Sequence, residues 1–492
     1  MTSVLIPLAG YLLLTFALAL WAQRQASANS GNIVEEYFLG SRSMGGFVLA
    51  MTIIASYTSA SSFIGGPGVA YRLGLGWVLL AMIQVPTTFL TLGVLGKRFA
   101  ILGRRLHVIT ITDFLYERYR SDAVVILCSL AVLVFFAASM IAQFIGGGRV
   151  FQAVTGYSYE TGLFVFGISV VLYTTIGGFR AVVLTDALQG IVMLAASVVV
   201  FIAVVCACGG MGSAMQSLKA IDPMLITPFG SGGNSISPPF LFSFWILVGF
   251  GILGLPQTTQ RCFGYRDSRS MHNAMVMGTA IIGLLLLLMH LTGALGRALL
   301  PDLPSGDLVI PTLILKYLPP FWAGVFVAGP LAAIMSTVDT MLLLLSAAII
   351  KDLYIRYWLK NEAERISPVK MRRMSLGCTL CMGVLVFIAA FNPPDLLVWI
   401  NLFAFGGLEA VFLWPIILGL YWKKANAAGA VCSIIGGTGI FVALTTGKLN
   451  VLGTHPIVPT LIATLLVFVI GNRFGKAPEG VVRVFWDGEK AA

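Results

Sequence analysis

Hydroxyl side chains at helical spacing in the segment 331–340 have the chemistry of a cation site. Ala333, Ser336 and Thr337 stand at positions i, i+3 and i+4, so they share one face of a helix. Two hydroxyls and a backbone carbonyl offer the oxygen ligands that a hard cation prefers. Ala55 and Thr58 repeat the i, i+3 spacing in an earlier segment, where a helix break would turn their carbonyls towards an ion. The pattern predicts sodium between the two segments, although small and hydroxylated residues also serve ordinary helix packing in membranes.

Glycine and proline interrupt two otherwise apolar segments. The first runs from Ala55 to Gly68, and the second runs from Gly249 to Gln257. A helix in lipid cannot leave backbone N–H and C=O groups unpaired, so a break is tolerated only where it lines a protein cavity. Two breaks, each at the start of a run of about five helices, predict a transporter with inverted repeats and a site near the middle of the bilayer.

The composition is that of a membrane protein. Of the 492 residues, 58% are hydrophobic and 10% are charged, and the mean hydropathy is +0.93. A soluble chain carries roughly 25% charged residues. Apolar runs of about 20 residues, long enough to cross a bilayer, predict an all-α polytopic protein with about 13 transmembrane helices. The predicted spans are 3–22, 44–70, 75–96, 122–148, 158–176, 182–208, 239–260, 271–296, 321–346, 373–391, 396–421, 427–446 and 457–472.

These spans predict one transmembrane transporter domain over 1–492. We expect an extra N-terminal helix and loop (1–43), a first repeat (44–208), a second repeat (239–421) and C-terminal helices with a short tail (427–492). The first span lacks a basic leader and is longer than the apolar core of a signal peptide, so we expect a retained helix.

The net charge of +11 is interpreted as a topology signal rather than a surface for nucleic acid. With the N-terminus outside and the C-terminus in the cytoplasm, most of the 31 Lys and Arg fall on inner loops, Arg261 among them. We expect a protein of the plasma membrane, the inner membrane of a bacterium. Cys378 and Cys381 resemble half of a metal or redox motif but have no second pair nearby, so we predict no metal site there.

Several motifs resemble the sodium/solute symporter family across nearly the whole chain. Those shared with the family at large are TIGGFRA at 175–181, LTDALQ at 184–189, AAIMST at 332–337, KDLY at 351–354 and GLYWKKANAAGA at 419–430. Those that within the family favour a carrier of pantothenate are EYFLGSRSMGG at 36–46, ASSFIGGPG at 60–68, GWVLLAMIQ at 76–84, DLVIPT at 307–312, FGGLEAVFLWP at 405–415 and HPIVP at 455–459.

The resemblance implies a five-plus-five inverted-repeat fold with a broken first helix in each repeat. It also implies that Ala55, Thr58, Ala333, Ser336 and Thr337 form the sodium site. The activity implied is sodium-coupled uptake of pantothenate, without enzymatic chemistry and without an obligate protein partner. Another small carboxylate or an amino acid is the alternative cargo, and a transporter-like sensor is the alternative function.

Two acidic residues stand near the implied sodium site. The match of Asp186 to the Thr-Asp pair of the family implies a place on the sodium exit path, and a helix cap is the alternative. Asp339 follows Ser336 by three residues, where some family members bind a second sodium through hydroxyls. An acid departs from that pattern, so a second cation held with Thr340 and Asp186, a proton, or a neutral buried acid all remain open.

Substrate contacts are expected where the helices break. Each of these residues could instead make an ordinary interhelical contact. Family matches imply Tyr57, Ser59 and Ser62, and further candidates are Gln84, Gln257, Asn401 and Phe405.

Overall fold

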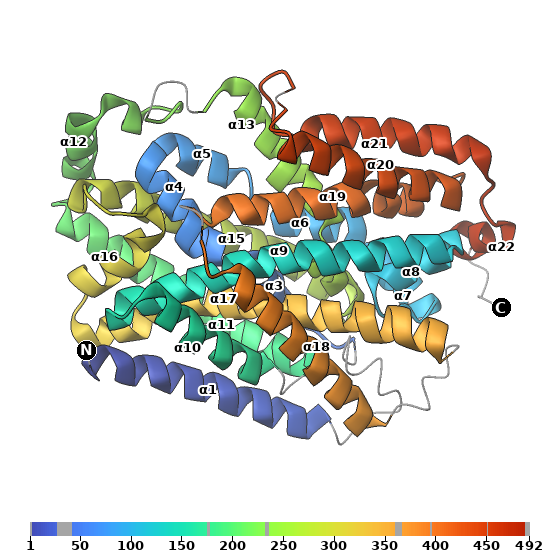
Figure 1. The fold of residues 1–492 in the computed structure, drawn as a ribbon, viewed down its shortest axis with the longest axis horizontal. Coiled ribbons are helices and arrows are strands. Elements are labelled where there is room, and N and C mark those ends of the chain that lie inside the picture. The colour runs from blue at the N-terminus through green and yellow to red at the C-terminus, as the bar shows by residue number, and fades with distance from the viewer. Residues whose placement is uncertain are drawn as a thin grey trace.

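The computed structural model describes residues 2–26, 42–174, 178–231, 236–359, 367–393, 396–449 and 451–487. Parts of the motifs at 36–46 and 175–181, and of the predicted loop ending at 43, lie outside these residues. Within the described ranges, two isolated β-bridges are the only strand-like pairings, so the chain is all-helical as predicted (Figure 1).

Each predicted span coincides with an apolar helix or a bent helix pair, and all but the span at 158–176 are long enough to cross a bilayer. Ten helices are long and apolar enough to cross a bilayer, and two bent helix pairs pass the same test as units. A shorter apolar helix covers Tyr159–Val171, within the predicted span 158–176. The long helices are α1 (Thr2–Ala26), α9 (Asp122–Thr155), α11 (Gly178–Ala207), α15 (Ser268–Leu299), α17 (Pro320–Ser346), α18 (Pro368–Ala389), α19 (Val398–Tyr421), α20 (Ala427–Thr446) and α21 (Ile457–Gly471).

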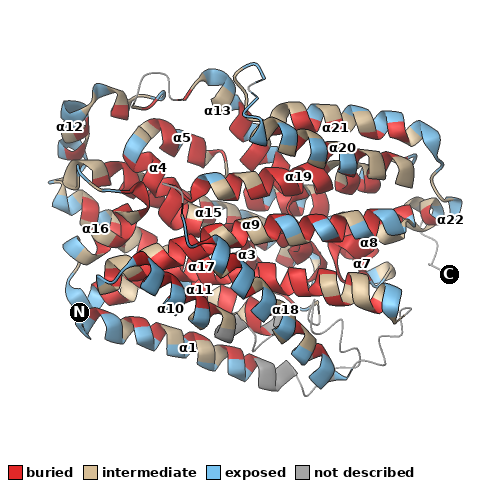
Figure 2. Cartoon of the chain, in the orientation of Figure 1, coloured by how far each residue is buried: buried red, intermediate tan, exposed pale blue. Residues whose placement is uncertain are grey.

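The helix α17 lies at the centre of the bundle. In the most apolar stretch of the span Pro320–Trp358, 89% of the residues are buried, against 22% in α1 at the edge. Figure 2 shows this contrast: α17 and α3 (Gly46–Tyr57) are buried along most of their length, whereas α1 and α18 carry exposed outer faces. A central helix can present polar groups to its neighbours without exposing them to lipid, and α17 carries the predicted cation ligands.

The first broken helix bends by 71° between Gly46–Tyr57 and Ser61–Leu73. The break lies at Thr58 and Ser59 rather than at the Gly-Gly-Pro sequence that suggested it. Gln143 of α9 accepts a hydrogen bond from the Ala60 amide at 2.8 Å, which satisfies a backbone group freed by the break. Gly66 lies in the second half-helix, where an added Cβ would come within 2.3 Å of His290 Nε2. The glycines therefore allow close packing, and the hydroxyl-rich stretch before them forms the break.

The second broken helix bends by 50° between Pro238–Gly254 and Pro256–Phe263. Leu255 at the junction has extended dihedral angles (φ −91°, ψ 111°), as expected for a residue before proline. A π-helical turn over Trp245–Phe250 and a 3-10 turn over Gly251–Gly254 precede it. Here the predicted position of the break is confirmed.

The two ends of the described chain lie at opposite ends of the bundle, with α1 starting at one end and α22 (Glu479–Val482) at the other (Figure 1). An odd number of spans produces this arrangement. This arrangement is compatible with the predicted topology.

An ionic cluster joins the two halves of the chain near the end where α22 lies. The carboxylate of Asp113, in the short helix α8 (Ile111–Tyr119), accepts hydrogen bonds from the Lys351 ammonium group and from Arg356 Nη2, the latter at 2.9 Å. Burial alone would raise the pKa of Asp113, but the two cations outweigh it and hold the pKa below its usual range. Lys351 of the KDLY motif thus links α8 to the π-helical segment Ala347–Trp358 that continues α17.

Candidate functional site

The two segments predicted to bind sodium meet in the structure. Ser336 Oγ donates to the Ala55 carbonyl at 2.9 Å, and Thr337 Oγ1 donates to the Thr58 carbonyl at 2.9 Å. Both hydroxyls also lie within hydrogen-bond distance of the Ala333 carbonyl, at 3.2 and 2.9 Å. All five residues are buried. Three carbonyls and two hydroxyls therefore converge in one buried place, and an all-oxygen set suits a hard cation.

The broken helix explains why these carbonyls are available. The last carbonyls of a helix have no partner within it, and α3 ends at Tyr57 with Thr58 in an extended conformation (φ −72°, ψ 132°). The Ile54 carbonyl is taken by Thr58, through its amide and its hydroxyl, each at 2.7 Å. The Ala55 and Thr58 carbonyls are thereby left to face α17.

A buried ion pair lies one helical turn from the hydroxyl cluster. Arg261 Nη2 is 3.1 Å from Asp186 Oδ2, and the two side chains are 1% and 0% exposed. The same nitrogen donates to Thr340 Oγ1 at 2.8 Å and to Ser56 Oγ at 2.9 Å. Thr52 Oγ1 adds a hydrogen bond to Asp186 Oδ2 at 2.6 Å. Arg261 thus connects the first broken helix, α11 and α17.

The structure corrects the predicted position of Arg261. The sequence placed it on an inner loop together with Arg266 and Arg269, but the structure buries it beside Asp186. The reason is local: Gln260–Phe263 forms a 3-10 turn at the end of the second broken helix, inside the bundle. Asp339 is also buried, one residue before Thr340 on α17.

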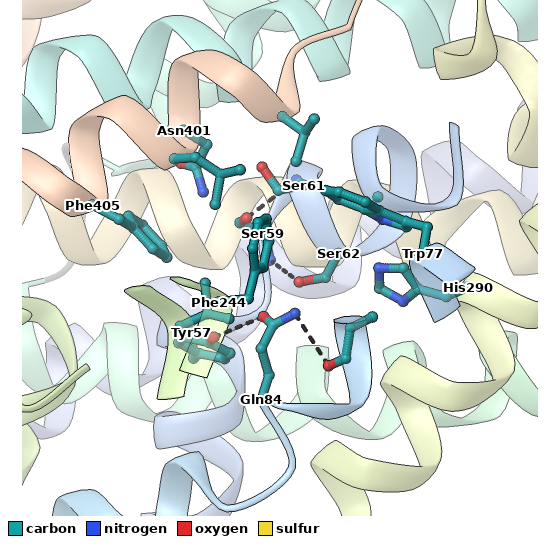
Figure 3. A pocket seen from close by; sticks show the side chains of 15 residues that line it. Tyr57, Ser59, Ser61, Ser62, Trp77, Gln84, Phe244, His290, Asn401 and Phe405 are labelled. Atoms are coloured by element: carbon teal, nitrogen blue, oxygen red, sulfur yellow. Dashed lines mark hydrogen bonds between the residues drawn. The ribbon is translucent and has the colours of Figure 1, made fainter. Parts of the chain in front are cut away.

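On the other side of the first break, polar and aromatic side chains line a small cavity (Figure 3). Tyr57 Oη donates to Gln84 Oε1 at 2.7 Å, and the Tyr57 ring packs near Phe405 with centroids 6.3 Å apart. The cavity volume is about 40 Å³, room for a few water molecules. Entry of a larger molecule therefore requires the lining side chains to move.

Six of the seven predicted substrate residues line this cavity. They are Tyr57, Ser59, Ser62, Gln84, Asn401 and Phe405. The seventh, Gln257, is buried in α14 (Pro256–Thr259) and does not line it. Asn401 is held by Ser139 of α9, whose Oγ donates to Asn401 Oδ1 at 2.6 Å.

Comparison with known proteins decides the family. The sodium:solute symporter family matches residues 37–437, most of the chain. The chain belongs to the sodium:solute symporter family.

Two bacterial members of this family are similar to the chain over almost its full length. The sodium/pantothenate symporter of Escherichia coli is 53% identical, covering 98% of both chains. The sodium/pantothenate symporter of Haemophilus influenzae is 48% identical, covering 96% of this chain and 97% of that protein. Sodium-coupled solute symport is the activity of the family, so the chain is a transporter and not an enzyme.

A solved structure of a Na⁺-coupled sialic acid symporter in an outward-open state shares the fold. Its TM-score is 0.77 at 17% identity, covering 97% of this chain and 99% of that one. The inverted-repeat fold with broken helices, predicted from the sequence, is thereby confirmed.

Three further residues with polar side chains line the cavity and were not among the predicted substrate contacts. They are His290, Trp77 and Ser61. Trp77 Nε1 and Ser61 Oγ are buried and have no hydrogen-bond partner among the described residues. His290 Nδ1 lies 2.8 Å from the Leu286 carbonyl. Because a carbonyl can only accept, Nδ1 carries the proton, and in a neutral ring Nε2 is left as an acceptor.

A signal for two of these residues existed in the sequence. Trp77 lies in the segment 76–84 that resembles pantothenate carriers, and a lone histidine in the middle of an apolar helix is unusual. The pairing of His290 with the first broken helix could not be predicted, because it depends on how α15 packs against α4 (Gly66–Leu73).

Proposed function

We propose that the chain couples inward movement of sodium to uptake of pantothenate by alternating access. The names of the relatives at 53% and 48% identity support this cargo. A family member that is an osmoregulated proline transporter of Bacillus subtilis is only 30% identical. An amino acid, or another small carboxylate, is therefore the second candidate cargo.

The observation that carries the proposal is the position of two consecutive residues. The carbonyl of Thr58 belongs to the hydroxyl cluster, and Ser59 lines the cavity. The two sites thus share one break in one helix. A change in the backbone on sodium binding is transmitted directly to the residues that would contact the cargo, which gives the coupling a physical route.

Sodium is assigned to Ala55, Thr58, Ala333, Ser336 and Thr337. In the structure the two hydroxyls donate to the carbonyls of the broken helix. With sodium between them, the hydroxyls would turn their lone pairs to the ion. Binding would then replace two direct hydrogen bonds between α3 and α17 by contacts through the cation.

We assign Asp186 and Thr340 to the exit path for sodium rather than to a second cation. Arg261 already supplies a positive charge between them, and a second cation would have to displace it. Asp339 stays the alternative acid for a second cation. A sodium ion that leaves the hydroxyl cluster would compete with the Arg261 guanidinium for the carboxylate of Asp186.

The cavity has groups that match pantothenate, which carries a carboxylate, an amide and two hydroxyls. Ser61 Oγ and Trp77 Nε1 are donors for oxygen atoms, and His290 Nε2 is an acceptor for a hydroxyl. The half-helix that begins after the break points its positive end at the cavity, as in transporters that hold a substrate carboxylate. The Ser61 amide at this end donates a hydrogen bond to Ser59 Oγ at 3.2 Å. The substrate carboxylate would replace Ser59 Oγ as the acceptor.

Replacement of His290 by leucine tests this match. His290→Leu removes the acceptor and should raise the KM for pantothenate roughly three- to tenfold, the worth of about one neutral hydrogen bond. The KM for sodium should change little, because His290 makes no contact with the hydroxyl cluster. His290→Gln, which keeps an acceptor, is the matched control. Equal KM values for pantothenate in wild type and His290→Leu would remove His290 from the binding site.

The cargo itself is tested by competition. Labelled pantothenate uptake into proteoliposomes should be inhibited by unlabelled pantothenate and much less by proline or by carboxylates that lack the hydroxyls. Inhibition by proline at equal concentration would favour the second candidate. A transporter-like sensor would bind pantothenate without accumulating it.

We also propose the orientation and the repeat boundaries. The inner end is the one that carries Arg98, Arg104, Arg105 and Arg356, so the N-terminus is outside and the C-terminus is inside, in the inner membrane of a bacterium. The repeats extend over 44–208 and 239–421, each beginning with a bent helix pair.

A further inference from the structure

Glu409 is a buried acid that neither the hydroxyl cluster nor the cavity uses. It stands in the middle of α19, is 0% exposed, and both of its carboxyl oxygens lack a hydrogen-bond partner among the described residues. Taking an unpaired carboxylate out of water costs several kcal/mol even after the protein relaxes. Burial without a partner therefore favours the neutral acid, with a proton on one oxygen.

The surroundings of Glu409 are shaped for a carboxyl group. A Cβ added to Gly251 would lie 2.3 Å from Glu409 Oε2, and one added to Gly254 would lie 3.1 Å from Glu409 Cα. Both glycines belong to the 3-10 turn that precedes the second break. Only the absence of side chains there leaves space for the acid, so the distorted helix and Glu409 fit together.

Glu409 also lies on the face of α19 whose residues line two cavities. Asn401 and Phe405, at eight and four positions before it, line the cavity at the first break. Phe412, three positions after it, lines a second small cavity with Asp352, Thr110 and Gln260. Spacings of three and four place these residues on one side of a helix. The acid thus lies along α19 between two cavities, and in the proposed orientation the one at the first break is the outer cavity and the one beside Asp352 is the inner cavity.

The elements packed against α19 bring few titratable groups near the acid. Tyr57, at the end of α3, is within electrostatic reach. The segment Trp245–Gly254 and the described parts of α20 and α21 carry no charged residue. The charged residues of α9 are Asp122 and Arg149, near its two ends, and those of α8 are Asp113, Glu117 and Arg118. Arg118 binds the Gly419 carbonyl, ten residues and about 15 Å further along α19.

We propose that Glu409 binds and releases a proton in each transport cycle, so that pantothenate enters with a proton as well as with sodium. The inference rests on the proposed function. When the outer cavity opens, water reaches the carboxylate and one O–H bond forms with a proton from outside. After closure the acid is buried and neutral, as in the structure. When the inner cavity opens, the same O–H bond breaks and the proton passes to cytoplasmic water.

The test is uptake by the full-length protein in proteoliposomes under two separate driving forces. The first is an inward sodium gradient at equal pH, and the second is an acid-outside pH gradient at equal sodium, with the membrane potential clamped at zero. Wild type should accumulate pantothenate under both. For one proton per pantothenate, the second accumulation should approach tenfold per pH unit, since each tenfold gradient supports tenfold accumulation.

The variant Glu409→Gln mimics the neutral acid but cannot exchange a proton. It should keep sodium-driven uptake and lose pH-driven uptake, while Glu160→Gln, an exposed glutamate of α10 (Tyr159–Thr174), should keep both. Infrared difference spectra give a readout independent of cargo: the C=O stretch of a protonated carboxyl should be missing in Glu409→Gln.

Several results would overturn the proton site. One is sodium-driven uptake by wild type with no pH-driven uptake. Another is a Glu409→Gln variant that retains pH-driven uptake or loses both modes. A third is loss of pH-driven uptake in Asp339→Asn but not in Glu409→Gln. Failure of wild type under the sodium gradient would instead overturn the proposed function, and the infrared band would then report on Glu409 alone.

Discussion

Removal of either hydroxyl from the cluster on α17 is expected to weaken sodium binding more than any other single change. Ser336→Ala or Thr337→Ala should raise the KM for sodium by about ten- to a hundredfold. Contacts to a charged partner are worth about 1.5–3 kcal/mol, and 1.4 kcal/mol is a factor of ten. Both alanines fit the buried contact with α3, so membrane insertion should persist.

The matched control is Ser346→Ala on the same helix. Ser346 is buried near Ser375, with the two hydroxyls 3.4 Å apart, and belongs to neither site. Its variant should keep the sodium dependence of wild type. An unchanged KM for sodium in both Ser336→Ala and Thr337→Ala would rule out the assigned cation site.

The second large effect is expected at the buried ion pair. Arg261→Met leaves the Asp186 carboxylate without its cation, and breaking a buried pair in this way costs about 3–5 kcal/mol. We expect a strong loss of thermal stability in detergent and little transport. The neutral double variant Arg261→Met with Asp186→Asn should recover most of the stability, because replacing both partners removes the uncompensated charge.

The double variant separates folding from gating. If Arg261 and Asp186 close the inner path, the stable double variant should release bound sodium faster than wild type. Equal thermal stability of wild type and Arg261→Met would mean that the pair is not energetically coupled, and the proposed exit path would lose its support.

The geometry of the hydroxyl cluster was predictable because helix geometry places Ala333, Ser336 and Thr337 on one face from their spacing alone. Their partners on α3 needed the additional fact that a helix breaks after Tyr57. The sequence located that break only approximately, since Gly65 and Gly66 were more conspicuous than Thr58 and Ser59. The structure shows that Gly66 serves contact with His290, and that the Gln143 side chain on α9 satisfies the Ala60 amide.

Long-range pairing accounts for what the sequence did not reveal. Arg261 and Asp186 are 75 positions apart, and nothing in the spacing of either residue indicates the other. Charge counting treats every arginine near a span end as a loop residue, so Arg261 was misplaced. His290 and Glu409 are visible in the sequence as polar residues in apolar helices, but the roles proposed for them depend on which helix each one faces.

The most direct test of the account is pantothenate accumulation by the purified protein in proteoliposomes with and without an inward sodium gradient. A tenfold gradient should support about tenfold accumulation for each sodium carried, and collapse of the gradient should release the accumulated pantothenate. The same accumulation with and without the gradient, or sodium-driven uptake of proline in place of pantothenate, would contradict the proposed function.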